Sequence, residues 1–237
     1  MEIKKLQQLI DESDNIVFFG GAGVSTESGI KDFRGKNGLY NENKEDINPE
    51  YMLSSRCLYK EPEMFYDYYR KNMNCLDIKP NVTHYYLTKL EEQGKLKAIV
   101  TQNIDGLHQK AGSKNVLEIH GSIMNNYCCK CGKDYDSNYI FESTGVPRCS
   151  CKGLIRPNVV LYGEMLPVSF SIARNYIYDA ELLIVAGTSL TVEPACSLLK
   201  VFNGKNLVII NNTKTKYDDD ADLVINKPLG EVFKKLK

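Results

Sequence analysis

The sequence predicts an α/β protein with a parallel sheet and a second, smaller domain that contains clustered cysteines. Short apolar runs rich in β-branched residues alternate along the chain with stretches of helical periodicity, which is the pattern of βα units. Several of these runs end in Gly, Ser, Thr or Asn, residues suited to a ligand crevice at the carboxyl ends of parallel strands. Five of the eight cysteines lie between Cys128 and Cys151, outside that repeating pattern.

The overall composition restricts the class of partner. The chain has 237 residues, of which 30 are basic and 30 are acidic, so no positive surface for nucleic acid or an anionic membrane is expected. No apolar run approaches the roughly 18 residues of a membrane-spanning helix, and the charged, amphipathic N-terminal segment is unlike a signal peptide. We therefore expect a cytoplasmic protein with no specific nucleic-acid partner and no membrane partner.

The first strand leads into a glycine-rich turn. Residues 2–12 have helical periodicity, and residues 16–19 are an apolar run typical of a buried parallel strand. The small residues of segment 20–30, GGAGVSTESGI, let a backbone approach a pyrophosphate. Thr26 stands where a third glycine completes the usual dinucleotide pattern, so this turn alone also fits an ordinary tight connection between a strand and a helix.

The next segments suggest a cover over this turn. Phe33 and Arg34 lie between glycines, where they fit either a buried ion pair beside a core aromatic ring or a water shield with a phosphate contact. Residues 37–82 are rich in Tyr, Asn, Lys and Glu, with helical periodicity near 48–55 and 62–73. We interpret them as a small helical insertion whose aromatic stripe packs in a core. Its members are Met64, Phe65, Tyr68, Tyr69 and Met73.

Two successive strands carry the strongest local signal for an active site. The apolar run 98–100 ends in a cluster of amides and a carboxylate that includes Gln102, Asn103 and Asp105. The strand expected over 115–119 delivers His120 at its end. Because the carboxyl ends of parallel strands meet at one edge of a sheet, we expect these four side chains to lie close together.

The cysteine cluster predicts a metal site. Cys128, Cys131, Cys149 and Cys151 form two closely spaced pairs separated by a polar connection, which suits a tetrahedral zinc site with four thiolates. Such a closed coordination sphere makes the zinc structural rather than catalytic. Cys129 is a spare thiol, and a redox-active thiol cluster is the alternative interpretation.

The C-terminal part continues the βα pattern. Apolar runs at 158–164, 182–185, 207–210 and 223–225 are each expected to form strands, and the last precedes a C-terminal helix. The second and third of these runs end in Gly, Thr, Ser or Asn. Repeated small polar strand ends favour a dinucleotide site in a doubly wound sheet.

Taken together, these motifs resemble the sirtuin family, in the family's order and over nearly the whole chain. The segments are GAGVSTESGI and DFRG within 21–35, TQNIDGLH at 101–108, the strand ending in His120-Gly121, the four cysteines, RPNVVLYGE at 156–164 and GTSL at 187–190. The resemblance implies a Rossmann-like parallel sheet with helices on both faces, which binds NAD and covers 1–36, 83–125 and 157–237. It also implies a small domain made of a helical module over 37–82 and a zinc-binding module over 126–156.

The resemblance also implies roles for individual residues. Ala22, Gly23 and Thr26 would meet the NAD pyrophosphate, with Asp32 and Arg34 nearby and Phe33 over the nicotinamide ribose. Gln102, Asn103, Ile104 and Asp105 would form the nicotinamide pocket. Gly187, Thr188, Ser189, Asn211, Asn212 and Leu229 would hold the adenosine part. Val160, Leu161, Tyr162 and Gly163 would pair with an extended substrate peptide, and His120 would contact NAD and act as the general base.

The implied activity is that of an NAD-dependent protein-lysine deacetylase with one structural Zn²⁺ per chain. Acetyl-lysine in a protein or peptide and NAD would be converted to lysine, nicotinamide and O-acetyl-ADP-ribose. The alternatives are a mono-ADP-ribosyltransferase, a deacylase for longer acyl groups, and a non-catalytic NAD sensor. Lys31 departs from the proline usual in the family, which predicts a more mobile cofactor loop.

A second departure from the family's sequence pattern indicates which acyl group is preferred. Family members that favour succinyl or malonyl groups have a Tyr-x-x-Arg pair in the helical module. Here Tyr69 stands at the arginine position, and Arg70 is one residue later. Tyr66 and Arg70 still lie one helical turn apart, so succinyl binding stays open, but we expect acetyl to be preferred.

Overall fold

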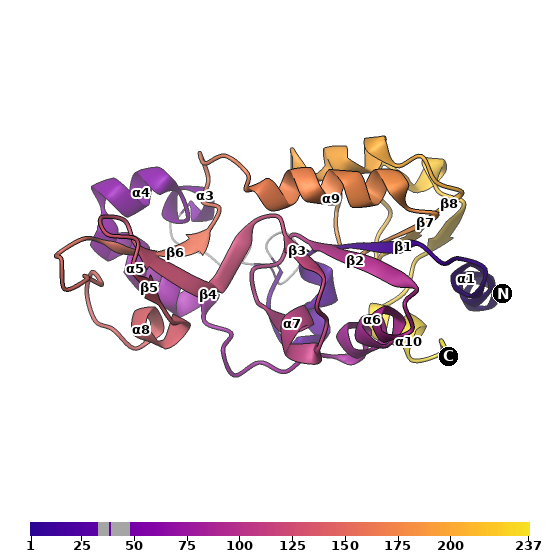
Figure 1. Cartoon of the computed structure of the whole chain (residues 1–237), viewed down its shortest axis with the longest axis horizontal. Helices are drawn as coiled ribbons and strands as arrows, with labels where there is room; N and C mark the ends of the chain where they lie inside the picture. The colour runs from indigo at the N-terminus through magenta and orange to yellow at the C-terminus, as the bar shows by residue number, and fades with distance from the viewer. Residues whose placement is uncertain (33–37, 39–47) are drawn as a thin grey trace.

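The computed structural model describes residues 1–32, 38 and 48–237. The molecule is elongated, with two lobes side by side along its long axis (Figure 1). We call the six-stranded sheet with its covering helices the large lobe. The three-stranded sheet with the helices packed against it is the small lobe. Phe33 and Arg34, two of the expected NAD contacts, lie outside the described residues.

The large lobe is built on a parallel sheet of order β3-β2-β1-β7-β8-β9. Its strands are β1 (Ile16–Gly20), β2 (Leu96–Thr101), β3 (Val116–Glu118), β7 (Leu182–Ala186), β8 (Asn206–Ile210) and β9 (Leu223–Ile225). The chain builds outward from β1 in one direction and then, from β7, in the other, so the order reverses between β1 and β7. This reversal is the switch point at which doubly wound sheets bind ligands.

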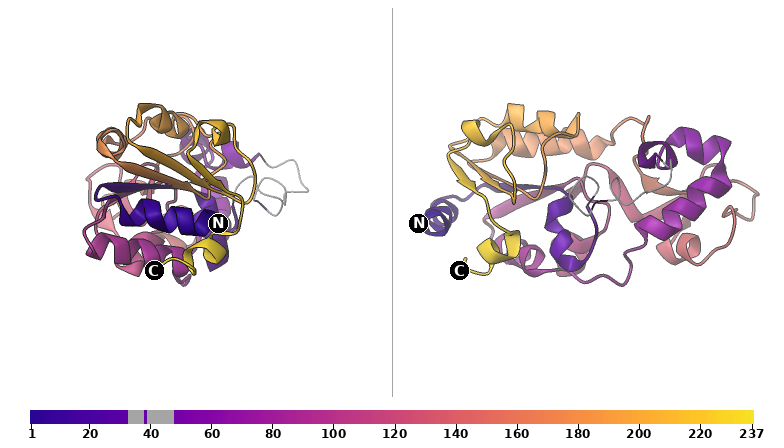
Figure 2. Two further views of the ribbon diagram at one scale, coloured as in Figure 1. Left: turned by 90° about the vertical axis from the view of Figure 1, so that its right-hand side faces the viewer. Right: turned by 180° about the vertical axis from the view of Figure 1, so that it is seen from behind.

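Helices cover both faces of this sheet (Figures 1 and 2). On one side lie α1 (Glu2–Asp11), α6 (Val82–Glu92), α7 (Leu107–Ala111) and α10 (Leu229–Phe233), and on the other α9 (Val168–Asp179) and the 3-10 helix η3 (Ala195–Val201). Alternate strand residues serve the two faces, because Phe18 packs in the core with α1, α6 and α10, whereas Phe19 packs in the core with α9 and η3. Both sides of the sheet are therefore buried, as the apolar runs predict.

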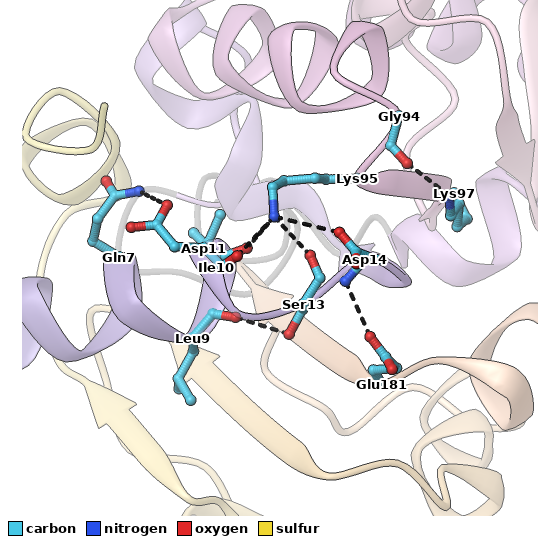
Figure 3. Close-up of polar contacts among 10 residues, drawn as sticks. All are labelled: Gln7, Leu9, Ile10, Asp11, Ser13, Asp14, Gly94, Lys95, Lys97 and Glu181. Atoms are coloured by element: carbon cyan, nitrogen blue, oxygen red, sulfur yellow. Dashed lines mark hydrogen bonds and ion pairs between the residues drawn. The ribbon is translucent and has the colours of Figure 1, made fainter.

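Lys95, just before β2, fixes the end of α1 against the sheet (Figure 3). Its ammonium donates hydrogen bonds to the carbonyl oxygens of Ile10 (3.1 Å), Asp11 (2.9 Å) and Ser13 (3.0 Å). The same group lies 3.7 Å from the carboxylate of Asp14. A cation is favourable at a helix C-terminus, where carbonyl groups lack partners in the helix. These contacts anchor the amino ends of the strands, away from the edge that carries the polar residues.

The small lobe contains an antiparallel sheet of order β5-β4-β6. Its strands are β4 (Gly121–Cys128), β5 (Asp134–Tyr135) and β6 (Ile155–Val159), and its helices are α3 (Pro49–Met52), α4 (Ser55–Lys60), α5 (Pro62–Met73) and α8 (Ser137–Phe141). The aromatic side chains of α5 form much of its separate core. Met64 is 43% exposed, so it does not belong to the expected buried stripe, whereas Tyr66 is fully buried.

The strand expected over 158–164 differs from the structure. β6 begins at Ile155, pairs antiparallel with β4, and ends at Val159. The following residues leave the ladder, and among them Gly163 has φ +90°, which lies outside the extended region. The other short elements among the described residues are the 3-10 helices η1 (Ala22–Val24), η2 (Thr26–Ser28) and η4 (Asp218–Asp220).

Both chain ends lie at the end of the large lobe that is distant from the small lobe (Figure 1). The backbone N–H of Lys237 donates to the side-chain oxygen of Gln7 (2.8 Å), and Lys227 pairs with Glu2 (2.8 Å). The N- and C-terminal segments are therefore tied together. Among the described helices, none combines the length and the apolar character needed to cross a membrane.

Candidate active site

A cleft between the two lobes collects the residues predicted from the sequence. It lies along the carboxyl ends of β1, β2, β7 and β8 and is closed on one side by the segment after β6. Every predicted NAD or peptide residue within the described ranges lines it. These are Ala22, Gly23, Thr26, Asp32, Gln102, Asn103, Ile104, Asp105, His120, Val160, Leu161, Tyr162, Gly163, Gly187, Thr188, Ser189, Asn211, Asn212 and Leu229.

The glycine-rich turn after β1 packs directly against the turn after β7. The N–H of Gly23 donates to the carbonyl of Gly187 at 2.8 Å. A Cβ at Gly23 would lie 2.7 Å from the Gly187 Cα, and Gly187 itself has φ +61°. Only glycine fits at both positions without displacing backbone. The two turns therefore form one floor at the switch point of the sheet.

A short network fixes the carboxylate at the end of β2. Ser25 donates its hydroxyl to the Asp105 carboxylate (2.6 Å), and Asn103 donates its amide to the Ser25 oxygen (3.0 Å). The second Asp105 oxygen accepts the N–H of Leu107 (2.9 Å). Burial raises the pKa of Asp105, although both hydrogen bonds oppose this. The result is a preoriented polar group at the base of the cleft.

A second network joins the two halves of the sheet. Gln102, after β2, donates its amide to the Thr188 hydroxyl, after β7, at 3.0 Å. Asn211, after β8, accepts the N–H of Thr188 and donates to its carbonyl, both at 2.9 Å. Side chains from three strands thus bond to one another at the carboxyl edge. This is the convergence that the strand-end residues predict.

His120 lies where the two lobes meet. Its Nδ1 is 3.0 Å from the carbonyl oxygen of Gln102. A carbonyl accepts only, so Nδ1 donates and Nε2 of the neutral ring is left as the acceptor. Burial lowers the pKa of His120, and the hydrogen bond to Gln102 partly offsets that effect. The imidazole is therefore neutral at physiological pH and able to accept a proton through Nε2.

The segment after β6 is attached both to His120 and to the small lobe. The N–H of Val160 donates to the carbonyl of His120 at 2.8 Å. Tyr162 donates its N–H to Leu53 (3.0 Å) and accepts the N–H of Ser55 (3.1 Å). The main chain of residues 160–163 is thus held in the wall of the cleft, next to the histidine.

The cysteine cluster has the geometry of a zinc site. The sulfur atoms of Cys128, Cys131, Cys149 and Cys151 all lie within 4.8 Å of one another, with Cys128–Cys151 at 3.5 Å and Cys131–Cys149 at 3.6 Å. A tetrahedron of Zn–S bonds of about 2.3 Å has sulfur atoms about 3.8 Å apart, so these residues fit the metal. Cys129 is exposed and outside the cluster.

The comparisons with known proteins agree with this geometry. The model of the Sir2 family matches residues 21–194. The chain belongs to the Sir2 family. It is similar to the NAD-dependent protein deacetylase of Clostridium acetobutylicum, with 53% identity over 98% of this chain and 96% of the relative. It is also similar to that of Clostridium perfringens, with 52% identity over 99% and 98%.

Solved Sir2 structures have the same fold as this chain. A Sir2 structure with a deacetylated p53 peptide and 3′-O-acetyl ADP ribose superposes with a TM-score of 0.91 at 41% identity, covering 99% of this chain and 96% of that chain. A Sir2 structure with a p53 peptide and NAD⁺ gives a TM-score of 0.88 at 41% identity, covering 99% and 97%. This agreement extends over both lobes, and it confirms the predicted fold class.

The cleft of this Sir2-family chain also contains residues that sequence reasoning missed. Ser25 lies inside the glycine-rich motif and donates a hydrogen bond to Asp105, so its hydroxyl within that motif is a signal that the sequence offers. Cys75 lies just after α5, and Phe170 lies near the start of α9. Residues 192–194 line the cleft as well. These last contributions depend on how the lobes meet, and no local pattern marks them.

Tyr66 and Arg70 are occupied elsewhere in the small lobe. The Tyr66 hydroxyl donates to the Ile155 carbonyl at 2.5 Å. Arg70 donates to the carbonyl of Ile140 (2.9 Å) and the hydroxyl of Ser143 (2.8 Å). Neither residue lines the cleft formed by the described residues. In this Sir2-family member the two residues stabilise the junction of α5 with β6 and with the end of α8.

Proposed function

We propose that this chain is an NAD-dependent protein-lysine deacetylase. It converts acetyl-lysine, NAD and water to lysine, nicotinamide and O-acetyl-ADP-ribose. The observation that carries the proposal is the position of His120, which lines the cleft between the polar strand ends and the segment 160–163 and whose Nδ1 bond to Gln102 leaves Nε2 as the acceptor. The deacetylases of the two Clostridium species, each more than half identical to this chain, support it.

Different residues of the cleft bind different parts of NAD and the peptide. Ala22, Gly23 and Thr26 bind the NAD pyrophosphate at the glycine floor. The strand ends bind the rest of NAD: Asp32, Gln102, Asn103, Ile104, Asp105, Gly187, Thr188, Ser189, Asn211, Asn212 and Leu229. Phe33 and Arg34, outside the described residues, remain part of this proposal. Val160, Leu161, Tyr162 and Gly163 bind the acetylated peptide.

NAD supplies the ribose carbon that receives the acetyl oxygen once nicotinamide departs. His120 is the proton acceptor for the ribose hydroxyls, because the Gln102 carbonyl keeps it in the tautomer with an open Nε2. A positioned general base of this kind contributes roughly 10²- to 10⁴-fold to a rate. Activity should therefore fall as the pH drops through the lowered pKa of His120.

Zinc, held by Cys128, Cys131, Cys149 and Cys151, is structural in this proposal, because four thiolates leave no position for water. A zinc–thiolate site suits a reducing compartment, which supports a cytoplasmic location. The domain boundaries are also proposed: 1–36, 83–125 and 157–237 for NAD, 37–82 for the helical module and 126–156 for the zinc module. β4 and β6 cross two of these boundaries and connect the units.

The proposed acyl group is acetyl. A succinyl carboxylate needs a cation in the acyl pocket, and the guanidinium of Arg70 is bonded to Ile140 and Ser143 instead. Tyr69, which lines the cleft, offers no positive charge. Acetyl-lysine is therefore favoured over succinyl-lysine.

The test is a nicotinamide-release assay with NAD and one peptide sequence in acetylated, succinylated and unmodified forms. We expect release with the acetylated peptide and formation of O-acetyl-ADP-ribose. His120→Ala should abolish deacetylation, and with it formation of O-acetyl-ADP-ribose, while zinc stays bound. Release without an acylated peptide would support ADP-ribosyl transfer or NAD hydrolysis instead, and NAD binding without any release would support a sensor. Preference for the succinylated peptide would contradict the acyl assignment.

A further inference from the structure

Residues 160–163, which form one wall of the cleft, are held in place partly by a hydrogen bond to a side chain. Val160 and Tyr162 donate their N–H groups to the carbonyls of His120 and Leu53. Leu161 instead donates its N–H to the carboxylate of Glu164, at 2.9 Å. Because this stretch lies beyond the end of β6, no strand ladder fixes it. Its conformation therefore depends on where the Glu164 carboxylate is held.

Arg156 holds that carboxylate through two parallel contacts. The Nη1–Oε1 distance is 2.5 Å and the Nη2–Oε2 distance is 2.9 Å. The side chain of Arg156 is 7% exposed and that of Glu164 is 23% exposed. A bidentate pair of this kind fixes orientation as well as distance. Partial burial also protects it from the screening that weakens surface ion pairs.

The same guanidinium reaches the strand that precedes the segment. Nη2 also donates to the carbonyl of Val159 (3.0 Å), and Nε donates to that of Pro157 (3.2 Å). Arg156 therefore joins the last residues of β6 to Glu164, which follows residues 160–163 and lines both the main cleft and the hollow behind it. In the described structure Arg156 lines the shallow hollow behind this segment, together with Tyr127 and Asn158, and does not line the main cleft.

The electrostatics keep both groups charged. Burial raises the pKa of Glu164, but the hydrogen bonds from Arg156 and Leu161 outweigh it and lower the pKa below its usual value. Burial acts against the charge of Arg156, and the Glu164 carboxylate reverses this and raises the pKa of the guanidinium. Removing either partner would leave the other as a buried charge without compensation.

We propose that Arg156 and Glu164 are positioning residues for the acetylated peptide. Their ion pair sets the backbone of residues 160–163 in the form that receives the peptide, and Arg156 does so without touching the substrate. The inference rests on the proposed function, since it assigns this segment to peptide binding. It separates peptide affinity from NAD affinity, because the NAD residues belong to strand ends that the pair does not contact.

The experiment compares Glu164→Gln and Arg156→Lys with wild type in steady-state kinetics. Glutamine keeps an acceptor for the Leu161 N–H but loses the negative charge. Lysine keeps the positive charge but cannot form the two parallel contacts of the guanidinium. We expect the KM for the acetylated peptide to rise about tenfold in each, while kcat and the KM for NAD stay within about twofold. Arg174→Lys, at an exposed position of α9, is the matched control with unchanged constants.

A second substrate separates positioning from general weakening of the fold. Free Nε-acetyl-lysine has no flanking peptide backbone, so its KM should differ little between the variants and wild type. Equal losses with both substrates, together with lower kcat and loss of zinc, would overturn the proposal in favour of a purely structural role. An unchanged peptide KM in both variants would overturn it as well. If wild type itself shows no peptide-dependent nicotinamide release, the proposed function fails instead.

Discussion

The two lobes reach a defined structure by different means. In the large lobe, β1 and β7 are five-residue strands with every residue buried, and helices cover both faces of the sheet. The small lobe has a three-stranded sheet in which β5 contains only two residues. Four cysteine thiolates, an aromatic helix and one buried ion pair supplement that sheet.

This difference separates the two substrate sites. The strands that carry the NAD side are fixed by burial of apolar area, which does not depend on metal. The peptide side is fixed by coordination and hydrogen bonds, which can each be removed by one substitution or one reagent. We therefore expect peptide binding to be more sensitive than NAD binding to loss of metal and to single substitutions.

The largest effect should follow removal of zinc. Cys149→Ser breaks the coordination sphere, and metal binding supplies folding free energy directly in small modules. Deacetylation and bound zinc should both be lost, which is read from nicotinamide release and metal content. Cys129→Ser, an exposed thiol outside the cluster, is the matched control and should retain both. Full activity of zinc-free protein would show that the small lobe needs no metal.

The junction between the lobes should be the next most sensitive place. Gly121 has φ +75°, and an added Cβ would collide with the Asn158 carbonyl and lie 2.9 Å from the Val159 Cα. Gly121→Ala should therefore lower the free energy of unfolding by about 3 kcal/mol. Gly145 also has a positive φ (+60°) but nothing within 4 Å, so Gly145→Ala should cost only about 1 kcal/mol. Equal losses in urea titrations of the two variants would contradict this account.

The stability of the large lobe should fall in acid, by an amount intermediate between the other predicted effects. All three histidines of the chain have a pKa lowered by burial, and that of His84 falls to about 4. The unfolded chain takes up protons below its own histidine pKa of about 6.5, whereas the folded chain resists. Stability should therefore be fully present above pH 6.5 and fall as the pH drops toward 4.

His84→Gln tests that assignment. The ring Nδ1 of His84 accepts the N–H of Asn81 in the capping box of α6, and glutamine at this position preserves the box. The variant should lose about 2 kcal/mol less than wild type between pH 6.5 and pH 4.5. Urea titrations across that range measure it, and identical pH slopes would rule out a contribution from His84.

The smallest effects should come from two neighbouring tyrosines of α5. Tyr66→Phe removes a buried hydrogen bond to Ile155 and should cost about 1 kcal/mol of stability. The Tyr69 hydroxyl is buried and has no hydrogen-bond partner among the described residues. Tyr69→Phe should therefore be neutral or slightly stabilising in thermal unfolding. A larger loss at Tyr69 than at Tyr66 would mean that its hydroxyl has a stabilising contact.

The sequence predicts the elements whose signals are local. β1, β7 and β8 are apolar runs, and the residues that follow them are small and polar, so both the strands and their polar ends were predictable. Cysteine spacing likewise identifies the zinc ligands. The same spacing leaves Cys129 as a spare thiol, and in the structure Cys129 is exposed and outside the cluster.

Other features depend on contacts between distant segments. The bonds of Tyr162 to Leu53 and Ser55 join residues more than a hundred positions apart, and no periodicity marks them. The bounds of β6 depend on its pairing with the distant strand β4. The position of Ser25 beneath Asp105 requires that β1 and β2 be neighbours, which the chain order alone does not specify.

The joined chain ends have a practical consequence. Both termini lie at the pole of the molecule opposite the small lobe (Figure 1), and Lys237 is bonded to Gln7. A tether at either terminus would attach the protein to a bead or a sensor chip with its cleft turned toward the solution. Immobilised protein could then be exposed in turn to NAD and to acylated peptides, and each association followed without hindrance from the support.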